Sequence, residues 1–417
     1  MTHQTSDRLD LLYRISQTFN SSLDLDHVLE KVMDEAILTI HAERGFLMLI
    51  DQSGSLVMRS ARGMDQRAIN QSDFQFSQGV VERVAREGKP LLTSNAQADS
   101  RLGNLNSIHI FGLRSILCVP LQLKGNTLGV VYVDNHLQSG IFQRDDLELL
   151  NFIASSAAIA IENARLYAVA IEKGRLEREL QMARGVQTSL LPQQTPQVPG
   201  WQFAAFWKPA REVSGDYYDF ISNNSGQQGL VIADVSDKGM PAALFMALTR
   251  STVRASVTQA NTPAQNITQV NQLICLDAAD GMFVTLFYAQ LDLLTGSLTY
   301  VNAGHNPPVF YQSASEGGAL LKRTGMALGV EDSNVYEQHT IQLEPGDFVL
   351  MYTDGVCDAI NQTSLQFGEE RLQNVLLNHC HASAKEILDS LEESVNQFVQ
   401  DSVPFDDITA LIVKRNE

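Results

Sequence analysis

The sequence contains little cysteine, with four residues spread over 417 positions. They form no CxxC pair, which argues against a disulfide framework and against a structural zinc site. Cys118 and Cys357 lie in apolar runs, where a buried, reduced thiol is the ordinary state. The low cysteine content therefore predicts a cytoplasmic protein.

Long apolar runs are also absent. Met1–Asp10 is polar and lacks the apolar core of a secretory signal. The most apolar helical stretch, Phe152–Ile161, contains serines and several alanines, and it is shorter than the ~20 apolar residues that span a bilayer. The sequence therefore predicts no membrane-spanning helix.

Positive charge is scarce, because 30 Lys and Arg face 48 Asp and Glu, for a net charge of −18. This balance argues against a nucleic-acid partner and against binding to an anionic membrane surface. No GxxxxGK[ST] loop is present, which lowers the case for nucleotide chemistry. The length allows two or three domains, each with its own core.

The pattern divides the chain into four predicted parts, which are an N-terminal helix (1–22), a first domain (23–163), a helical linker (164–191) and a second domain (192–417). In the first domain, Asp26–Ile40 has apolar residues at helical spacing, with Asp26 as the expected N-cap. Three apolar runs predict strands, and Lys124-Gly125-Asn126 predicts a hairpin between the last two. These runs are Gly45–Ile50, Ser115–Leu123 and Thr127–Asp134.

Three runs in the first domain resemble a GAF domain. They are FSQGVVERVAREGKPLLTSNAQADSR, LRSILCVPLQLKGNTLGVVYVDN and FQRDDLELLNFIASSAAIAIENARLY. The resemblance implies an antiparallel sheet with helices that binds a small ligand or relays a signal through dimerisation. The sequence has no Cys-His pair suited to a bilin and no Asn-Lys-Phe-Asp-Glu signature, so the ligand is unknown.

One long helix is predicted from Asp146 to Leu191. Apolar positions in its first part recur three and four apart, as in a coiled-coil seam, and the spacing resumes after Gly174 in a shifted register. We expect a parallel dimeric coiled coil with a discontinuity near Gly174; the alternative is a helix that packs on its own domain. The two sets are Leu150, Ile153, Ala157, Ala160, Ala164, Tyr167 and Ile171, then Leu176, Leu180, Ala183, Gln187 and Leu190.

Prolines 192, 196 and 199 end this helix, and a strand-rich domain follows. Its helices are expected near Pro241–Val257, Thr262–Asp277 and Ala384–Gln400. Four aspartate motifs lie beside apolar strands, and they are SGDYYD (Asp216, Asp219), ADVSDKG (Asp234), YTDG (Asp354) and DDIT (Asp406, Asp407).

An Asp-Gly pair alone is usually only a turn. Four strand-adjacent aspartates in one domain suggest more, since their like charges would repel if they gathered without cations. Phosphate-ester hydrolysis needs an activated water and positive charge at the phosphoryl oxygens, and two hard divalent cations with oxygen ligands supply both.

The second domain resembles the SpoIIE/RsbU branch of the metal-dependent protein phosphatases over residues 176–414. The motifs that carry this resemblance are ERELQMARGVQTSLLP, SGDYYDF, ADVSDKGMPAAL, MFVTLFYAQLD, NAGHNPP, GMALGV, PGDFVLMYTDGVCDA and DDIT. It implies a β-sandwich flanked by helices that binds two Mn²⁺ or Mg²⁺ ions. The predicted fold class for the whole chain is therefore α+β.

The resemblance also implies roles for individual residues. Asp234 is expected to bridge the two metals, and the Val235 carbonyl to bind the first. Asp354 and Asp406 are expected to bind the second metal, with Asp407 as the fallback for Asp406. Asp216, supported by Asp219, is expected to hold a metal-bound water or the first metal.

Three residues near these motifs have open roles. His305 of NAGHNPP is a general acid or, more in keeping with a Gly/Pro turn, a structural histidine. Arg211 is a phosphate clamp or a surface ion-pair partner. Asp237-Lys238-Gly239 departs from the Gly-His-Gly of many relatives, which leaves the leaving-group acid unassigned.

The resulting hypothesis is hydrolysis of phosphoserine or phosphothreonine on a protein. The resemblance implies a phosphorylated STAS-type anti-sigma-factor antagonist as substrate, regulation by the GAF domain, and a homodimer through the GAF domain and linker helices. Two alternatives stay open, a catalytically inactive scaffold that binds the same partner and an enzyme that acts on nucleotides or small phosphate esters.

Overall fold

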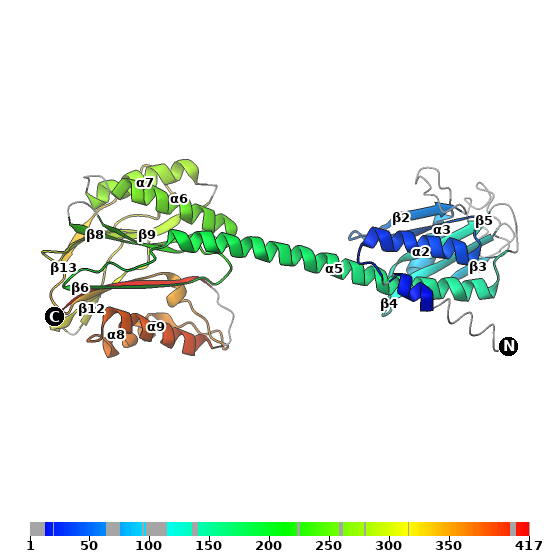
Figure 1. The fold of residues 1–417 in the computed structure, drawn as a ribbon. Helices are drawn as coiled ribbons and strands as arrows, with labels where there is room; N and C mark the ends of the chain where they lie inside the picture. The colour runs from blue at the N-terminus through cyan, green and yellow to red at the C-terminus, as the bar shows by residue number, and fades with distance from the viewer. Residues whose placement is uncertain are drawn as a thin grey trace. The chain divides into compact units, whose positions relative to one another are not determined.

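The structure is a computed structural model that describes residues 13–19, 21–63, 76–93, 96, 115–135, 141–222, 226–257, 262–278, 281–315, 317–400 and 406–416. Contacts divide the chain into two units, Met1–Leu176 and Glu177–Glu417, which are described separately. Figure 1 labels their helices and strands. Among the described helices, none combines the length and apolarity needed to cross a bilayer. All four cysteines are free thiols, as expected.

The first unit is built on one antiparallel sheet in the order β2-β1-β5-β4-β3. Residues 13–19 are helical. The elements that follow are α2 (Leu25–Ile40), β1 (Arg44–Ile50), β2 (Leu56–Gly63), α3 (Gln78–Glu87), β3 (Leu91–Thr93), β4 (Ser115–Leu123), β5 (Asn126–Asn135) and α5 (Arg144–Leu190), which continues into the second unit.

Two local predictions in this unit have different outcomes. The β4–β5 hairpin is confirmed, because Lys124 and Gly125 form a two-residue turn with positive φ at both positions. The expected N-cap is wrong. Asp24, not Asp26, caps α2, since its side chain accepts a hydrogen bond of 2.9 Å from the backbone N–H of His27.

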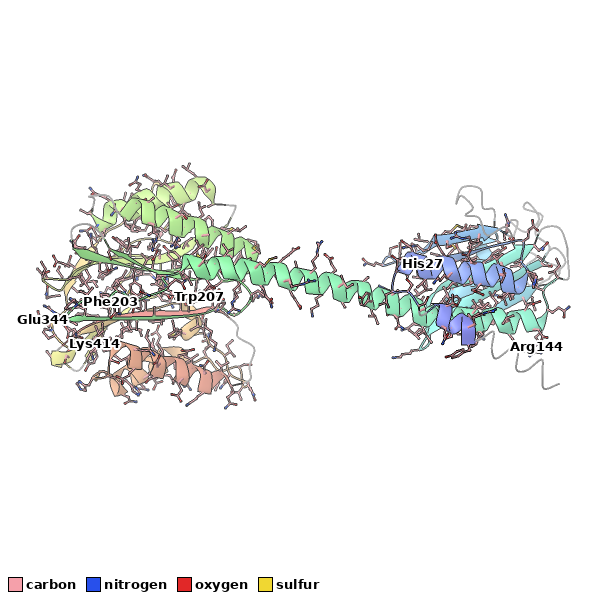
Figure 2. All side chains as sticks on the ribbon, viewed as in Figure 1. His27, Arg144, Phe203, Trp207, Glu344 and Lys414 are labelled. Atoms are coloured by element: carbon pink, nitrogen blue, oxygen red, sulfur yellow. The ribbon has the colours of Figure 1, made fainter. Side chains whose placement is uncertain are left out.

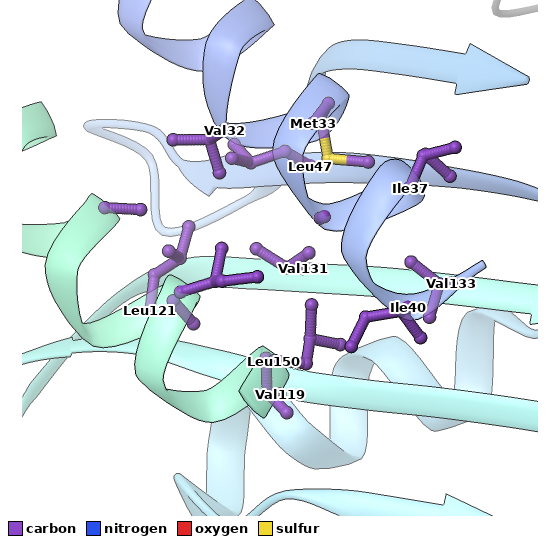
Figure 3. Packing of buried hydrophobic residues seen from close by; sticks show 14 of the residues in the cluster. Val32, Met33, Ile37, Ile40, Leu47, Val119, Leu121, Val131, Val133 and Leu150 are labelled. Atoms are coloured by element: carbon purple, nitrogen blue, oxygen red, sulfur yellow. The ribbon is translucent and has the colours of Figure 1, made fainter. Parts of the chain in front are cut away.

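Alternate side chains of the strands enter two different cores, because successive residues of a strand face opposite sides of the sheet. Val119 and Val131 pack with α2 and the start of α5, as Figure 3 shows. Cys118 and Tyr132 pack on the other face with α3. Helices therefore cover both faces of the sheet.

The first part of α5 is a core helix of the first unit. Leu150, Ile153, Ala157 and Ala160, all predicted seam residues, are buried in the same cluster as α2. For these positions the coiled-coil interpretation is wrong, and the alternative of a helix packed on its own domain is correct. An apolar row at heptad spacing does not distinguish a partner helix from the helix's own sheet.

A different face of α5 carries an exposed apolar row, which consists of Ile159, Leu166, Val169 and Leu176. These side chains are 47%, 58%, 61% and 56% exposed. The steps between them are seven, three and seven residues, and steps of four and three continue the row to Leu180 and Ala183. α5 is unbroken through Gly174, so the expected discontinuity is absent on this face. The predicted register shift came from treating residues of a buried face, such as Leu150, and residues of an exposed face, such as Leu176, as one seam.

The second unit contains two antiparallel five-stranded sheets, in the orders β13-β10-β9-β8-β7 and β12-β11-β14-β15-β6. The strands are β6 (Trp201–Lys208), β7 (Tyr217–Ser222), β8 (Gln227–Val235), β9 (Val284–Asp292), β10 (Ser297–Ala303), β11 (Val309–Gln312), β12 (Gly317–Leu320), β13 (His339–Gln342), β14 (Phe348–Tyr352) and β15 (Ile408–Arg415). The helices are α6 (Met240–Val257), α7 (Pro263–Asp277), η2 (Ser313–Ser315), η3 (Asp354–Val356), α8 (Gly368–Asn378) and α9 (Ala384–Val399).

The two sheets share one apolar cluster, to which Phe287 of β9 and Leu411 of β15 both belong. A second cluster joins α6 and α7 to the β8 sheet, and a third joins α8 and α9 to the β15 sheet. The unit is thus layered helix, sheet, sheet, helix (Figure 1). The three predicted helices appear as α6, α7 and α9, with bounds within one residue of those expected.

Candidate active site

Strand pairing brings the acidic motifs together two by two. Tyr217 pairs with Ala233, so Asp216 at the start of β7 lies beside Asp234 at the end of β8. Tyr352 pairs with Ala410, so Asp354 follows the end of β14 where Asp406 and Asp407 precede β15. Each sheet therefore presents two of the four motifs at one of its ends.

Two glycines hold the paired motifs in close contact. A Cβ at Gly215 would lie 3.1 Å from the carbonyl oxygen of Val235. A Cβ at Gly355 would overlap the carbonyl oxygen of Asp407. Since only glycine allows these approaches without displacing the backbone, each glycine joins one motif to its neighbour.

Hydrogen bonds join the two sheets at this end. The Oδ2 atom of Asp216 accepts a bond of 2.8 Å from Thr353 Oγ1 and one of 2.6 Å from Thr409 Oγ1. Thr353 directly precedes Asp354, and Thr409 belongs to the DDIT motif. All four motifs therefore meet in one neighbourhood.

The carboxylates in this neighbourhood raise each other's pKa. Burial, followed by the charges of Asp354, Asp406 and Asp407, raises the pKa of Asp234 to about 7. Burial and the charge of Asp234 raise the pKa of Asp216 well above its usual range. Burial and the charge of Asp406 raise the pKa of Asp354. No described Arg or Lys forms an ion pair with Asp216 or Asp234.

This donor set suits a hard divalent cation, because it consists of carboxylate and carbonyl oxygens with uncompensated negative charge. In the conformation seen, no group of three or more His, Cys, Asp or Glu side chains in the described ranges is arranged to hold an ion. The ammonium of Lys238 lies 2.9 Å from Asp406 Oδ2 instead. Rotation of these side chains would bring their oxygens around an ion, whereas the uncompensated negative charge is present in every rotamer.

The adjacent aspartates 406 and 407 have different surroundings. Asp407 accepts hydrogen bonds from the backbone N–H groups of Ala210 and Gly215 and from Ser214 Oγ, at 2.7 to 2.9 Å. These hydrogen bonds fix the loop before β7 to the Asp407 carboxylate. Asp406 contacts a cation, Lys238. This favours Asp406 over Asp407 as the predicted ligand.

Residues 224–416 match the family described as Stage II sporulation protein E (SpoIIE), and residues 22–162 match the GAF domain. The chain thus joins a region that matches the GAF domain to a region that matches SpoIIE. The predicted combination of a GAF domain with a SpoIIE-type domain is therefore confirmed. The predicted mixture of helices and sheets is confirmed as well.

Two curated relatives support this result. The chain is 34% identical over 278 residues to protein IcfG of Synechocystis sp., which covers 60% of this chain and 44% of IcfG. It is 29% identical over 240 residues to phosphoserine phosphatase RsbU of Bacillus subtilis, which covers 58% of this chain and 71% of RsbU. The chain thus spans less than half the length of IcfG.

Among solved structures, the SiaA-PP2C domain of Pseudomonas aeruginosa matches with a TM-score of 0.53 and 21% identity. The match covers 59% of this chain and 99% of that domain. At this identity the likeness shows the fold, which is PP2C-like.

Asp219 of the SpoIIE-type domain does not support Asp216, contrary to expectation. Its buried carboxylate accepts two hydrogen bonds from the Arg254 guanidinium on α6, one of them 2.6 Å long, and lies 3.8 Å from Arg250. The pairing ties β7 to α6. Asp219 is therefore a structural residue of this domain.

His305 has the structural surroundings that its turn predicted. It is buried, its Nδ1 atom lies 2.8 Å from Thr285 Oγ1, and its backbone N–H donates to Asn302 Oδ1. Burial lowers the pKa of His305 to about 3, so the ring is neutral at neutral pH and carries no proton to donate as an imidazolium. Arg211 is exposed, and none of the ion pairs seen in the described regions includes it.

Several residues around the site were not predicted. Thr353 and Thr409 bind Asp216, and their positions inside the YTDG and DDIT motifs were a usable signal. Ser214 contacts Asp407, and the Gln187 amide contacts Ser214. Nothing in the sequence pairs Gln187 with a loop 27 positions further on.

Proposed function

We propose that the chain hydrolyses phosphoserine or phosphothreonine esters on a protein substrate in a metal-dependent reaction. The observation that carries the proposal is the gathering of four acidic motifs into one neighbourhood. There the charges of Asp354 and Asp406 raise the pKa of Asp234. The phosphoserine phosphatase RsbU, to which the chain is similar, supports the reaction class.

Two Mn²⁺ or Mg²⁺ ions would supply an activated water and positive charge for the phosphoryl oxygens. In this proposal Asp234 and the Val235 carbonyl would hold the first ion. Asp354 and Asp406, together with Asp234, would hold the second. Asp216, held by two threonine hydroxyls, orients water or the first ion.

The proposed substrate is a phosphorylated STAS-type antagonist of an anti-sigma factor, as the resemblance to the SpoIIE/RsbU branch implies. A decisive experiment offers this phosphoprotein, p-nitrophenyl phosphate and nucleotides to the purified chain, with Mn²⁺ and with chelator. We expect Mn²⁺-dependent release of phosphate, fastest from the phosphoprotein. Faster hydrolysis of nucleotides would contradict the substrate assignment. Tight binding of the phosphoprotein without turnover would favour the scaffold alternative.

We also propose that α5 pairs with α5 of a second copy through the row from Ile159 to Ala183, which is exposed from Ile159 to Leu176 and half-buried at Leu180 and Ala183. Its heptad steps and its large exposed side chains are those of a coiled-coil seam that lacks its partner. The double substitution Leu166→Glu with Val169→Glu should convert a dimer to a monomer in sedimentation experiments. Ala168→Glu, which lies off the row, is the matched control. A wild-type monomer at micromolar concentration would end this proposal.

The GAF domain is proposed to bind a small ligand in a cavity of ≈ 500 Å³. Side chains of β1, β2 and α3 line it, including Met48, Ile50, Leu56, Val81 and Arg86. Mass spectrometry of the natively purified chain would detect a retained ligand. Bound ligand should then change the phosphatase rate, and a rate unchanged by ligand would contradict regulation through this domain.

A further inference from the structure

Gln187, near the end of α5, forms two hydrogen bonds with the backbone of a single residue, Ser214, within the second unit. Its Nε2 atom donates a hydrogen bond of 2.6 Å to the carbonyl oxygen of Ser214. Its Oε1 atom accepts one of 3.0 Å from the N–H of the same residue. The Gln187 side chain is 4% exposed, so both bonds are shielded from water.

Ser214 leads from this contact directly into the acidic site. Its hydroxyl donates to Asp407 Oδ2 at 2.7 Å, and it accepts from the backbone N–H of Asp216 at 3.1 Å. The indole of Trp207, labelled in Figure 2, donates at 3.2 Å both to the Ser214 hydroxyl and to the carbonyl of Asp216. Together with the N–H groups of Ala210 and Gly215, Ser214 therefore joins the loop before β7 to Asp407.

The backbone of Ser214 depends on Gln187 because residue 214 lies between β6 and β7 and belongs to neither strand. Buried backbone N–H and C=O groups need partners, and here one side chain provides both. Turning α5 by one residue, about 100°, would withdraw the amide and leave both groups unpaired.

We propose that Gln187 is a positioning residue that couples the rotational setting of α5 to the order of the loop carrying Asp216. When the amide is in place, Ser214 holds Asp407 and the N–H of Asp216, and the first acidic motif stays beside Asp234. When it is withdrawn, the loop loses its anchor and the site loses affinity for metal. The effect on turnover rests on the proposed phosphatase function.

The test compares full-length wild type with Gln187→Met, which keeps the size of the side chain and removes both hydrogen bonds. Gln193→Met is the matched control, because Gln193 donates to the carbonyls of Thr188 in α5 and of Leu191 just after it, and neither bond reaches the loop before β7. Calorimetry measures Mn²⁺ affinity, p-nitrophenyl phosphate assays give kcat and KM, and amide hydrogen exchange reports on residues 214 to 216. Thermal unfolding confirms that each variant is folded.

For Gln187→Met we expect Mn²⁺ affinity to weaken about tenfold, with a similar fall in kcat, because two buried groups lose their partner. KM should stay within about twofold, since substrate is not touched, and the Ser214 amide should exchange at least about tenfold faster. Gln193→Met should match wild type. Wild-type Mn²⁺ affinity and wild-type exchange in a folded Gln187→Met protein would overturn the proposal, as would a fall in thermal stability with unchanged metal affinity.

A second variant, Ser214→Ala, covers the case in which Gln187→Met does not fold. It keeps the backbone pair with Gln187 and removes the hydroxyl that reaches Asp407, so Mn²⁺ affinity should weaken while the Ser214 amide stays protected. Unchanged affinity here would also overturn the proposal. If wild type itself binds no Mn²⁺ and releases no phosphate, the proposed function fails. Hydrogen exchange in the two variants then still decides whether Gln187 holds the loop.

Discussion

The GAF domain and the SpoIIE-type domain differ in what surrounds their buried carboxylates. In the GAF domain, the fully buried Asp134 is bound by the Arg44 guanidinium through two hydrogen bonds, 2.7 and 3.1 Å long. In the SpoIIE-type domain, Asp216 and Asp234 face other carboxylates. The first arrangement balances charge within the chain, whereas the second leaves negative charge that a divalent cation would offset. The missing counter-charge, more than the buried aspartate itself, marks the candidate site.

The same contrast exists inside the SpoIIE-type domain. Asp219 and Asp216 lie three residues apart, yet Asp219 is neutralised by Arg254, whereas Asp216 accepts hydrogen bonds from two uncharged threonine hydroxyls. Variants that remove charge from each kind of site should therefore behave differently, and the experiments below test this.

The largest effect is expected from Asp234→Asn. Turnover with Mn²⁺ should fall about a thousandfold, because Asp234 is the proposed shared ligand of both ions and its loss would remove several kcal/mol of transition-state stabilisation. Thermal unfolding of the metal-free variant should show a fold at least as stable as wild type, since one of several repelling charges is gone. Asp389→Asn, on exposed α9, is the control. Full turnover by Asp234→Asn would show that the metal assignment is wrong.

Arg44→Met should have a large effect on folding stability and a small one on turnover. It leaves the buried Asp134 charge without its partner, which typically costs about 3–5 kcal/mol of folding free energy. Denaturant unfolding should show an early transition of the GAF domain, while turnover by the SpoIIE-type domain is retained at low temperature. Wild-type unfolding of this variant would mean that the pair adds no stability.

A pH effect of moderate size should distinguish the metal-free protein from the metal-bound one. Asp234 has its pKa raised from 3.8 to about 7, so the folded state binds more protons than the unfolded state between these values. The stability of the metal-free protein should therefore fall as pH rises from about 4 to 7, by several degrees in Tm. With saturating Mn²⁺ this loss should vanish. Thermal scans in chelator and in Mn²⁺ measure the difference, and parallel curves would contradict it.

The smallest effect is expected from Lys238→Met. Its ammonium lies 2.9 Å from Asp406 Oδ2, and both side chains are about one-third exposed, at 34% and 27%. The pair is therefore worth less than about 1 kcal/mol, and removing it should strengthen Mn²⁺ binding up to about fivefold. Lys385→Met, which removes an exposed pair on α9, should leave calorimetric affinity unchanged. Weaker binding by Lys238→Met would indicate that the lysine helps to build the site.

Sequence patterns predicted the acidic motifs because each lies at the end of an apolar strand, where a local pattern is enough. They failed where the deciding contact is distant. The role of Asp219 depends on Arg254, which lies 35 residues away on another element. The choice between Asp406 and Asp407 depends on the loop at residues 210–215, almost 200 residues earlier.

The linker helix shows a second kind of limit. Heptad spacing predicted a helix correctly, but it did not reveal what covers each face. Leu150 and Ile153 are covered by their own domain, and Gln187, expected in a coiled-coil seam, hydrogen-bonds to Ser214. A periodic row identifies a buried face, and only the fold identifies what lies against it.

Gly355 leaves no room for a side chain where the YTDG and DDIT motifs approach each other. A methyl group is the smallest side chain that could replace its hydrogen, and the carbonyl of Asp407 already fills the volume where that methyl would stand. A single added carbon would therefore push the turn after β14 away from the strand that begins at Ile408. The close approach of two acidic motifs therefore depends on the hydrogen atom that serves as the side chain of Gly355.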